Sequence, residues 1–266
     1  MTFRWKEEID MHITWYGTAS IKLDDGDTTL LFDPYIRPNK KLEPVTVDDF
    51  TGADAILVTH GHVDHIADIP KITQADRSVP VYCTKTPSAT LQKFGVGAER
   101  IREIAPGDSF SVGEFRVRVY QGRHVAFDPG YIAQVFPQCF VKFPVVFKME
   151  YYNILMPENG EIVVYEVENR GKRVVLMGSY GTAEGVEYPR EPDAFVLPYG
   201  GNSNIAALSA PFIKAMSPKK IIVDHYDASF PPLTKRMDVE GFGRTLARNH
   251  PEIKYVIPQE YVPMAV

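Results

Sequence analysis

AILVTHGHVDH, residues 55–65, joins a short apolar run to a cluster of histidines. The run, residues 55–59, carries no charge, which is typical of a strand buried on both faces. The HxHxDH string, residues 60–65, follows it directly. Imidazole and carboxylate groups are the ligands that borderline divalent metals prefer. The stretch therefore predicts a metal site at the carboxyl end of a buried strand.

The spacing of the ligands within the string divides them between two metals. His60 and His62 lie two apart in an extended segment, so their side chains point the same way and can share one metal. Asp64 and His65 lie at the turn into the following predicted helix and can reach a neighbouring metal. A catalytic site needs three protein ligands and an open position for water, so each pair lacks one ligand.

Two distant histidines, His124 and His225, each follow another predicted strand and could complete one triad. A lone histidine at a strand end is usually just a satisfied polar group. Their position after strands, in a chain that already contains the cluster, favours ligation. His12 and His250 are interpreted as structural.

Strands cluster first in hairpins and later alternate with helices. We predict strands at 11–23, 28–32, 55–59, 79–83, 109–112, 115–120, 162–167, 173–177, 194–197, 220–223 and 255–257, and helices at 66–73, 86–94, 205–216 and 239–249. Two mixed sheets that face each other, with helices outside, would satisfy this order. We predict one domain over 1–266, with an aromatic-rich insertion around 128–160 that fits the strand count worst.

Composition bounds the class of protein. The chain has 266 residues, 44% hydrophobic and 24% charged, which excludes a disordered or fibrous chain. The net charge of -5 argues against a nucleic-acid partner. Cys83 and Cys139 form no CxxC pair, which favours a reducing compartment. We expect no signal peptide and no membrane-spanning run, and hence a cytoplasmic protein.

The motifs resemble those of the metallo-β-lactamase superfamily. The matching pieces are residues 13–20, 31–34, 59–65, His124, 178–180, 197–201 and 224–232. They are most similar to the small bacterial metal-dependent hydrolases of the ascorbate-6-phosphate lactonase-like branch. The resemblance implies an α+β, four-layer αββα sandwich (metallo-beta-lactamase fold) with the metals at one edge between the sheets.

The resemblance also implies a ligand set for one or two divalent metals. Zinc is the expected metal, with manganese and iron as alternatives. Ser179 stands where the branch usually has an aspartate that bridges both metals. One metallo-β-lactamase subclass also has serine there and uses two zincs, so the change weakens the second site without abolishing it. The implied ligands are His60, His62 and His124 for the first metal, and Asp64, His65 and His225 for the second.

Two weaker signals accompany the cluster. Asp33 is either an Asp-Pro turn starter or a partner that fixes the tautomer of a ligand imidazole. Gly201, Asn202 and Ser203 lead into the predicted helix 205–216, with Ser203 or Asn204 as its N-cap. Their backbone N–H groups either bind an anionic part of a substrate or simply cap the helix. The aromatic residues of 128–160 either pack in the core or form a lid or a dimer contact.

These observations favour a metal-dependent hydrolase whose metal-activated water attacks a small-molecule ester, lactone or phosphoester. Asp64 would be catalytic as well as a ligand, by orienting the nucleophile or taking its proton. The alternative is a degenerate metallo-beta-lactamase-fold protein that binds a ligand or metal without turnover. The expected partner is a small-molecule substrate, with no nucleic acid and no membrane; a homo-oligomer is left open.

Overall fold

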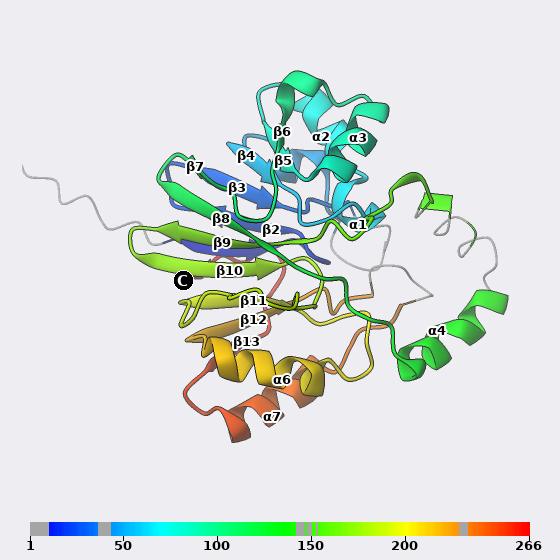
Figure 1. Cartoon of the computed structure of the whole chain (residues 1–266), viewed down its shortest axis with the longest axis vertical. Helices are drawn as coiled ribbons and strands as arrows, with labels where there is room; N and C mark the ends of the chain where they lie inside the picture. The colour runs from blue at the N-terminus through cyan, green and yellow to red at the C-terminus, as the bar shows by residue number, and fades with distance from the viewer. Residues whose placement is uncertain (1–10, 37–43, 142–146, 148–150, 153, 229–233) are drawn as a thin grey trace, which may run out of the picture.

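The computed structural model describes residues 11–36, 44–141, 147, 151–152, 154–228 and 234–266. Two seven-stranded mixed sheets lie face to face, and helices cover their outer faces (Figure 1). The predicted α+β sandwich is thereby confirmed. Residues 1–10, parts of 128–160 and the end of the 224–232 motif lie outside the described residues.

The first sheet has the strand order β14-β1-β2-β3-β4-β5-β6. The pairs from β3 to β6 are parallel, and those from β14 to β3 are antiparallel. Its strands are β1 (His12–Trp15), β2 (Ile21–Asp24), β3 (Thr29–Phe32), β4 (Ala55–Leu57), β5 (Val81–Cys83), β6 (Ile101–Glu103) and β14 (Met264–Ala265).

The second sheet has the strand order β13-β12-β11-β10-β9-β8-β7. Here the pairs from β10 to β13 are parallel, and those from β7 to β10 are antiparallel. Its strands are β7 (Ser109–Val112), β8 (Phe115–Gln121), β9 (Val163–Asn169), β10 (Lys172–Met177), β11 (Ala194–Pro198), β12 (Lys220–Asp224) and β13 (Lys254–Val256).

The helices form the outer layers. Figure 1 shows α2 and α3 over the first sheet and α6 and α7 over the second, while α4 lies outside these layers. No helix among the described residues is both long and apolar enough to traverse a bilayer. The helices are α1 (Val63–Ile66), α2 (Ile69–Ala75), α3 (Lys85–Lys93), α4 (Pro129–Val141), α6 (Ile205–Met216) and α7 (Val239–Asn249), with the 3-10 helices η1 (Val47–Phe50) and η2 (Ala98–Arg100).

Strand alternation divides the apolar residues between two clusters. In β4, Leu57 belongs to the core between the sheets, whereas its neighbour Ile56 packs in the cluster under α1, α2 and α3. Both side chains are fully buried, because β4 is a central strand with one face on each cluster. The uninterrupted apolar run of the sequence is the consequence of this position.

Two predicted elements were wrong in their bounds. The strand 11–23 is two strands, because Gly17 and Thr18 turn the chain with φ of 96° and 49° between β1 and β2. The predicted helix 66–73 is broken between α1 and α2, and Pro70 lies in the first turn of α2, where its missing N–H costs no hydrogen bond. The short strands β6 and β14 were not predicted.

Candidate metal centre

The candidate ligands gather at the carboxyl ends of strands from both sheets. His60 and His62 lie in the loop between β4 and α1, and Asp64 and His65 lie on α1 itself. From the second sheet, the site receives residues that follow β8, β10 and β12. The residues that follow these three strands are His124, Ser179 and His225. Parallel strands bring their carboxyl ends to one edge of a sheet, which is where ligands bind in open sheets of this kind.

The structure brings the six predicted ligands into two groups of three. In each group the ligand atoms lie within 4.8 Å of one another. The five imidazoles form a continuous row, with ring centroids 4.7 Å apart for His62 and His124 and 3.9 Å apart for His60 and His65. The groups are His60, His62 and His124, and Asp64, His65 and His225.

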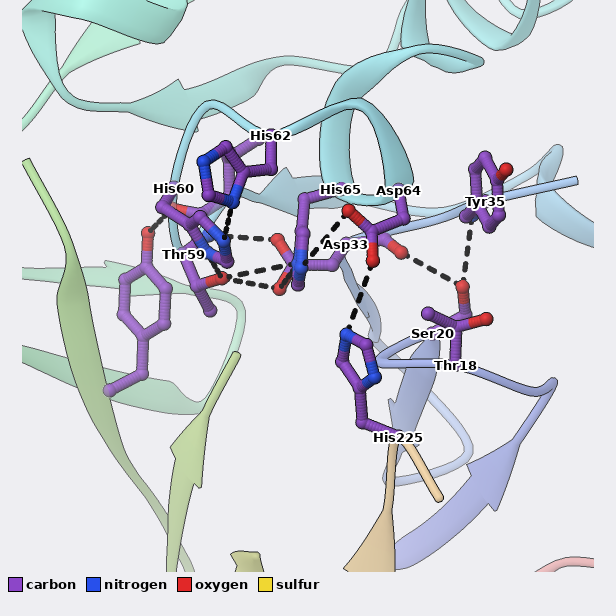
Figure 2. Close-up of polar contacts among 12 residues, drawn as sticks. Thr18, Ser20, Asp33, Tyr35, Thr59, His60, His62, Asp64, His65 and His225 are labelled. Atoms are coloured by element: carbon purple, nitrogen blue, oxygen red, sulfur yellow. Dashed lines mark hydrogen bonds and ion pairs between the residues drawn. The ribbon is translucent and has the colours of Figure 1, made fainter. Parts of the chain in front are cut away.

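Asp33 contacts His65, the ring of this row that lies between His60 and His225. Its Oδ2 lies 2.8 Å from Nδ1 of His65, which leaves the other ring nitrogen of His65 directed to Asp64 (Figure 2). The Thr59 backbone N–H donates to Asp33 Oδ1 at 2.8 Å and the Thr59 hydroxyl donates to Oδ2 at 2.5 Å. The carboxylate is thus fixed from two sides and selects one tautomer of the imidazole.

The second group contains a buried ion pair. Nε2 of His225 lies 3.2 Å from Oδ2 of Asp64 (Figure 2). Burial alone would raise the pKa of Asp64, but the charges of His65 and His225 and the hydrogen bond from His225 hold it well below its usual range. Burial alone would lower the pKa of His225, but the hydrogen bond and charge of Asp64 raise it to about 9. In the metal-free protein at pH 7, His225 is therefore protonated.

The first group, His60, His62 and His124, differs from the second in that burial lowers the pKa values of its imidazoles. Burial lowers the pKa of His62 to about 4 and also lowers the pKa values of His60 and His124. These three rings are neutral at pH 7. Neutral imidazole is the form that binds a metal, so this group needs no proton release before it can act as a ligand set.

Strained backbone surrounds the site. Thr18, Asp33 and His225 all have positive φ, at 49°, 45° and 53°. The His225 N–H donates to the Thr18 carbonyl at 2.8 Å, and the Thr18 N–H donates to Oδ1 of Asp227 at 3.1 Å. Such conformations persist only where their surroundings impose them, and they concentrate at functional sites. The β1–β2 turn thus positions His225, a role that the sequence did not reveal.

Ser179 supports the loop that carries His124. Its hydroxyl accepts a hydrogen bond from the Val125 N–H at 3.1 Å, and the residue lines the cavity. Its neighbour Gly178 permits close packing, since a Cβ there would overlap the Thr59 hydroxyl and lie 2.8 Å from Oδ2 of Asp33. Glycine is therefore required directly behind the Asp33 carboxylate.

Polar groups of the loop before α6 form hydrogen bonds to the segment that follows His124. The Ser203 N–H and hydroxyl donate to Asp128 at 2.7 Å and 2.5 Å, and Asn202 donates to the Ala126 carbonyl at 2.8 Å. The backbone N–H of Ser203 is therefore already bonded and is not open to a substrate anion. Of the three predicted residues, only Gly201 lines the cavity. Asn204 is the N-cap of α6.

A cavity of about 410 Å³ opens on the ligands. Five of the six candidate ligands line it, namely His62, Asp64, His65, His124 and His225. Beyond the ligands, its wall includes Phe127, Glu158 and Lys235, which the sequence did not single out, and Tyr131, one of the aromatic residues of 128–160.

The donor set fits divalent metals. It offers five imidazoles and one carboxylate, in two groups of three that share an open cavity. His12 and His250 belong to neither group; His250 lies at the end of α7, 3.3 Å from Glu252.

Comparisons with known proteins relate the chain to a family of metal-dependent hydrolases. The family model described as "Beta-lactamase superfamily domain" matches residues 28–204. A "UPF0173 metal-dependent hydrolase" of Xanthobacter autotrophicus is 26% identical over 93% of this chain and 95% of its own length.

Solved structures share the fold at low sequence identity. Igni18, a metallo hydrolase of Ignicoccus hospitalis, superposes with a TM-score of 0.66 at 18% identity, over 96% of this chain and 98% of its own. An isothiocyanate hydrolase from Delia radicum gut bacteria gives a TM-score of 0.61 at 15% identity, over 96% and 99% of the two chains.

Proposed function

Because the chain belongs to the beta-lactamase superfamily domain family, we propose that it is a metal-dependent hydrolase of a small-molecule ester, lactone or phosphoester. The observation that carries the proposal is the pair of three-ligand groups that share one open cavity. The relative from Xanthobacter autotrophicus, a metal-dependent hydrolase by name, supports it by its match over nearly the whole length of both chains.

One or two divalent metals are assigned to this site, with zinc as the expected ion. His60, His62 and His124 would hold the first, and Asp64, His65 and His225 the second. When bound, such metals lower the pKa of water and polarise the oxygen of the bond to be broken.

The protein's own groups supply orientation and proton transfer. Asp64 lies between His65 and His225, with one carboxylate oxygen toward each ring. Its low pKa keeps it ionised, so it can accept a hydrogen bond from water at the cavity floor and orient that water. Asp33 and Thr59 keep His65 in one tautomer and one orientation throughout.

A substrate screen tests the proposal. Lactones, phosphodiesters and thioesters would be offered to metal-reconstituted protein and to the same protein after chelation. We expect hydrolysis of one class that disappears with the metal and returns on its addition. Tight metal binding without turnover of any class would instead favour a protein that binds a ligand or metal only, the alternative that Ser179 motivates.

We propose that the substrate is a small molecule, because the cavity of about 410 Å³ has the size of a small-ligand site. We also propose that the protein is cytoplasmic. The cytoplasmic location rests on the sequence interpretation alone.

Replacing Asp33 by asparagine should weaken metal binding by about 10- to 100-fold, because partners of ligand imidazoles typically contribute that much. Asparagine keeps the size of the side chain but removes the charge that faces His65. Competition with a coloured chelator measures the affinity.

The control for Asp33→Asn is Asp25→Asn. Asp25 is equally buried, accepts a hydrogen bond from Asn169 at 2.6 Å and lies at the opposite end of β2. Equal losses of affinity in the two variants would show that Asp33 acts only through the stability of the fold.

Replacing Ser179 by aspartate should tighten the second metal by about tenfold or more, the scale that changes around metal ligands reach. A hydroxyl is a poor ligand at neutral pH, and a carboxylate would also compensate the repulsion between two cations. Calorimetric titration of the native protein should show a weaker second site, and Ser179→Ala provides the uncharged control. Two equally tight native sites, or no gain in the aspartate variant, would place Ser179 outside the metals' reach.

A further inference from the structure

Two aromatic rings form one wall of the cavity at the start of α4. Phe127 and Tyr131 stack on each other, with ring centroids 5.4 Å apart and an interplanar angle of 18°. Both residues line the cavity that holds the candidate ligands. We refer to this pair as the aromatic wall.

The aromatic wall begins directly beside a candidate ligand. The ring of Phe127 meets the ring of His124 edge-on, with centroids 5.8 Å apart and an angle of 83°. Gly201, on the opposite loop, packs closely against this part of the wall, since a Cβ there would lie 2.5 Å from Cγ1 of Val125 and 3.3 Å from Cε1 of Phe127. The wall is therefore adjacent to the place where a scissile bond must lie if His124 holds a metal.

The wall is held in position by hydrogen bonds. The Asp128 carboxylate accepts from the N–H groups of Gly130 and Tyr131 at 3.1 Å and 3.3 Å, and from Ser203 N–H and hydroxyl at 2.7 Å and 2.5 Å. One side chain thus fixes the first turn of α4 to the loop before α6. A wall fixed in this way can discriminate among ligands, because little ordering is needed when a ligand binds.

The rings of Phe127 and Tyr131 present apolar surface that a ligand can contact. Phe127 is 57% exposed, and neither ring belongs to the two core clusters of the described residues. Burial raises the pKa of Tyr131, and the charge of Asp64 adds to this, so the phenol stays neutral at pH 7. Val63, Val125 and Met237 add further apolar surface to the cavity. A flat, uncharged group would cover this surface most completely.

We propose that the aromatic wall selects substrates that carry a flat apolar group, such as an aromatic ring, next to the bond that is hydrolysed. This inference rests on the proposed function, because it needs a metal-held head group beside His124. It narrows the substrate class of the same site from any small ester, lactone or phosphoester to those with an aryl-like substituent.

Two phosphonates test the wall without turnover. Phenylphosphonate and methylphosphonate share a metal-binding head group and differ in the flat apolar group. Calorimetry on Zn²⁺-loaded protein should show phenylphosphonate binding about tenfold more tightly, in line with the strength of single aromatic contacts. Phe127→Ala and Tyr131→Ala should each reduce this preference severalfold, because each weakens the binding of phenylphosphonate more than that of methylphosphonate.

Ile132→Ala is the matched control. Ile132 is 49% exposed, lies on the same helix next to Tyr131, and is absent from the cavity wall. It should keep the full preference for phenylphosphonate.

Two results would overturn the inference in different ways. Equal affinity for the two phosphonates, or a preference that survives in both wall variants, would overturn the aromatic wall alone. Failure of both phosphonates to bind the Zn²⁺-loaded protein would overturn the metal-held head group on which the proposed function depends, and the wall with it. Because the wall variants are scored by a ratio, a partial loss of active protein does not imitate the effect.

Discussion

His62→Ala should abolish hydrolysis and the first metal together. His62 contributes one of the three neutral imidazoles of the first group and lines the cavity. Loss of one ligand from a set of three leaves too few to hold the ion, and the activation of water is lost with it. We expect the rate to fall by about 10³-fold or more. Metal content by elemental analysis and turnover of the best substrate from the screen measure the two effects.

His250→Ala is the control for His62→Ala. His250 lies at the end of α7 and belongs to neither ligand group. The variant should retain full metal content and activity. Unchanged metal stoichiometry in His62→Ala would refute its assignment as a ligand.

Asp64→Asn should reduce kcat by about 10²- to 10⁴-fold, the range typical of a positioned acid or base. The change keeps the shape of the side chain and removes the charge that pairs with His225. We expect the second metal to be lost while the first remains, so that stoichiometry falls from two to one. This outcome differs from that of His62→Ala, because the two residues belong to different groups.

The same variant has a readout that requires neither metal nor substrate. The carboxylate of Asp64 raises the pKa of His225 to about 9 against the effect of burial. In metal-free Asp64→Asn the burial remains and that charge is gone, so the pKa of His225 should fall. NMR titration of the histidine ring protons measures it.

Asp68→Asn is the control for Asp64→Asn. Asp68 is also buried, follows α1, and accepts a hydrogen bond from the Ile36 N–H at 2.8 Å, but it belongs to neither ligand group. If Asp68→Asn lowered kcat and the pKa of His225 equally, the assigned role of Asp64 would be wrong.

The layers of the fold were predictable because buried strands leave a simple signal. The apolar run of β4 and the alternation of β8 follow directly from their burial on two faces and one face, respectively. The break at Thr18 was not predictable in this way, because residues 11–23 alternate without interruption. Contacts that join the two sheets hold this turn, since the Thr18 carbonyl accepts from the His225 N–H and the Thr18 N–H donates to Asp227.

The candidate ligands were also predictable as residues, since HxHxDH is compact in the sequence. The residues that surround the candidate ligands could not be predicted from the sequence. The sequence left open whether the N–H groups near Ser203 bind a substrate anion or cap the helix, and the Ser203 N–H donates to Asp128, which lies 75 residues away. Tyr131 of the aromatic wall lies in the segment that fitted the strand count worst and Phe127 directly precedes it, and no periodic pattern marks a stacked pair at a helix start. The single-domain interpretation of 1–266 stays a prediction.

In the proposed metal centre, one cavity holds two metals on two groups of three ligands. A crystal structure of metal-reconstituted protein, with anomalous data collected on either side of the zinc absorption edge, tests it most directly. The account predicts two peaks, one among His60, His62 and His124 and a weaker one among Asp64, His65 and His225. A fully loaded protein whose metal lies elsewhere, or whose His225 keeps its contact with Asp64 with no metal beside it, would contradict the account.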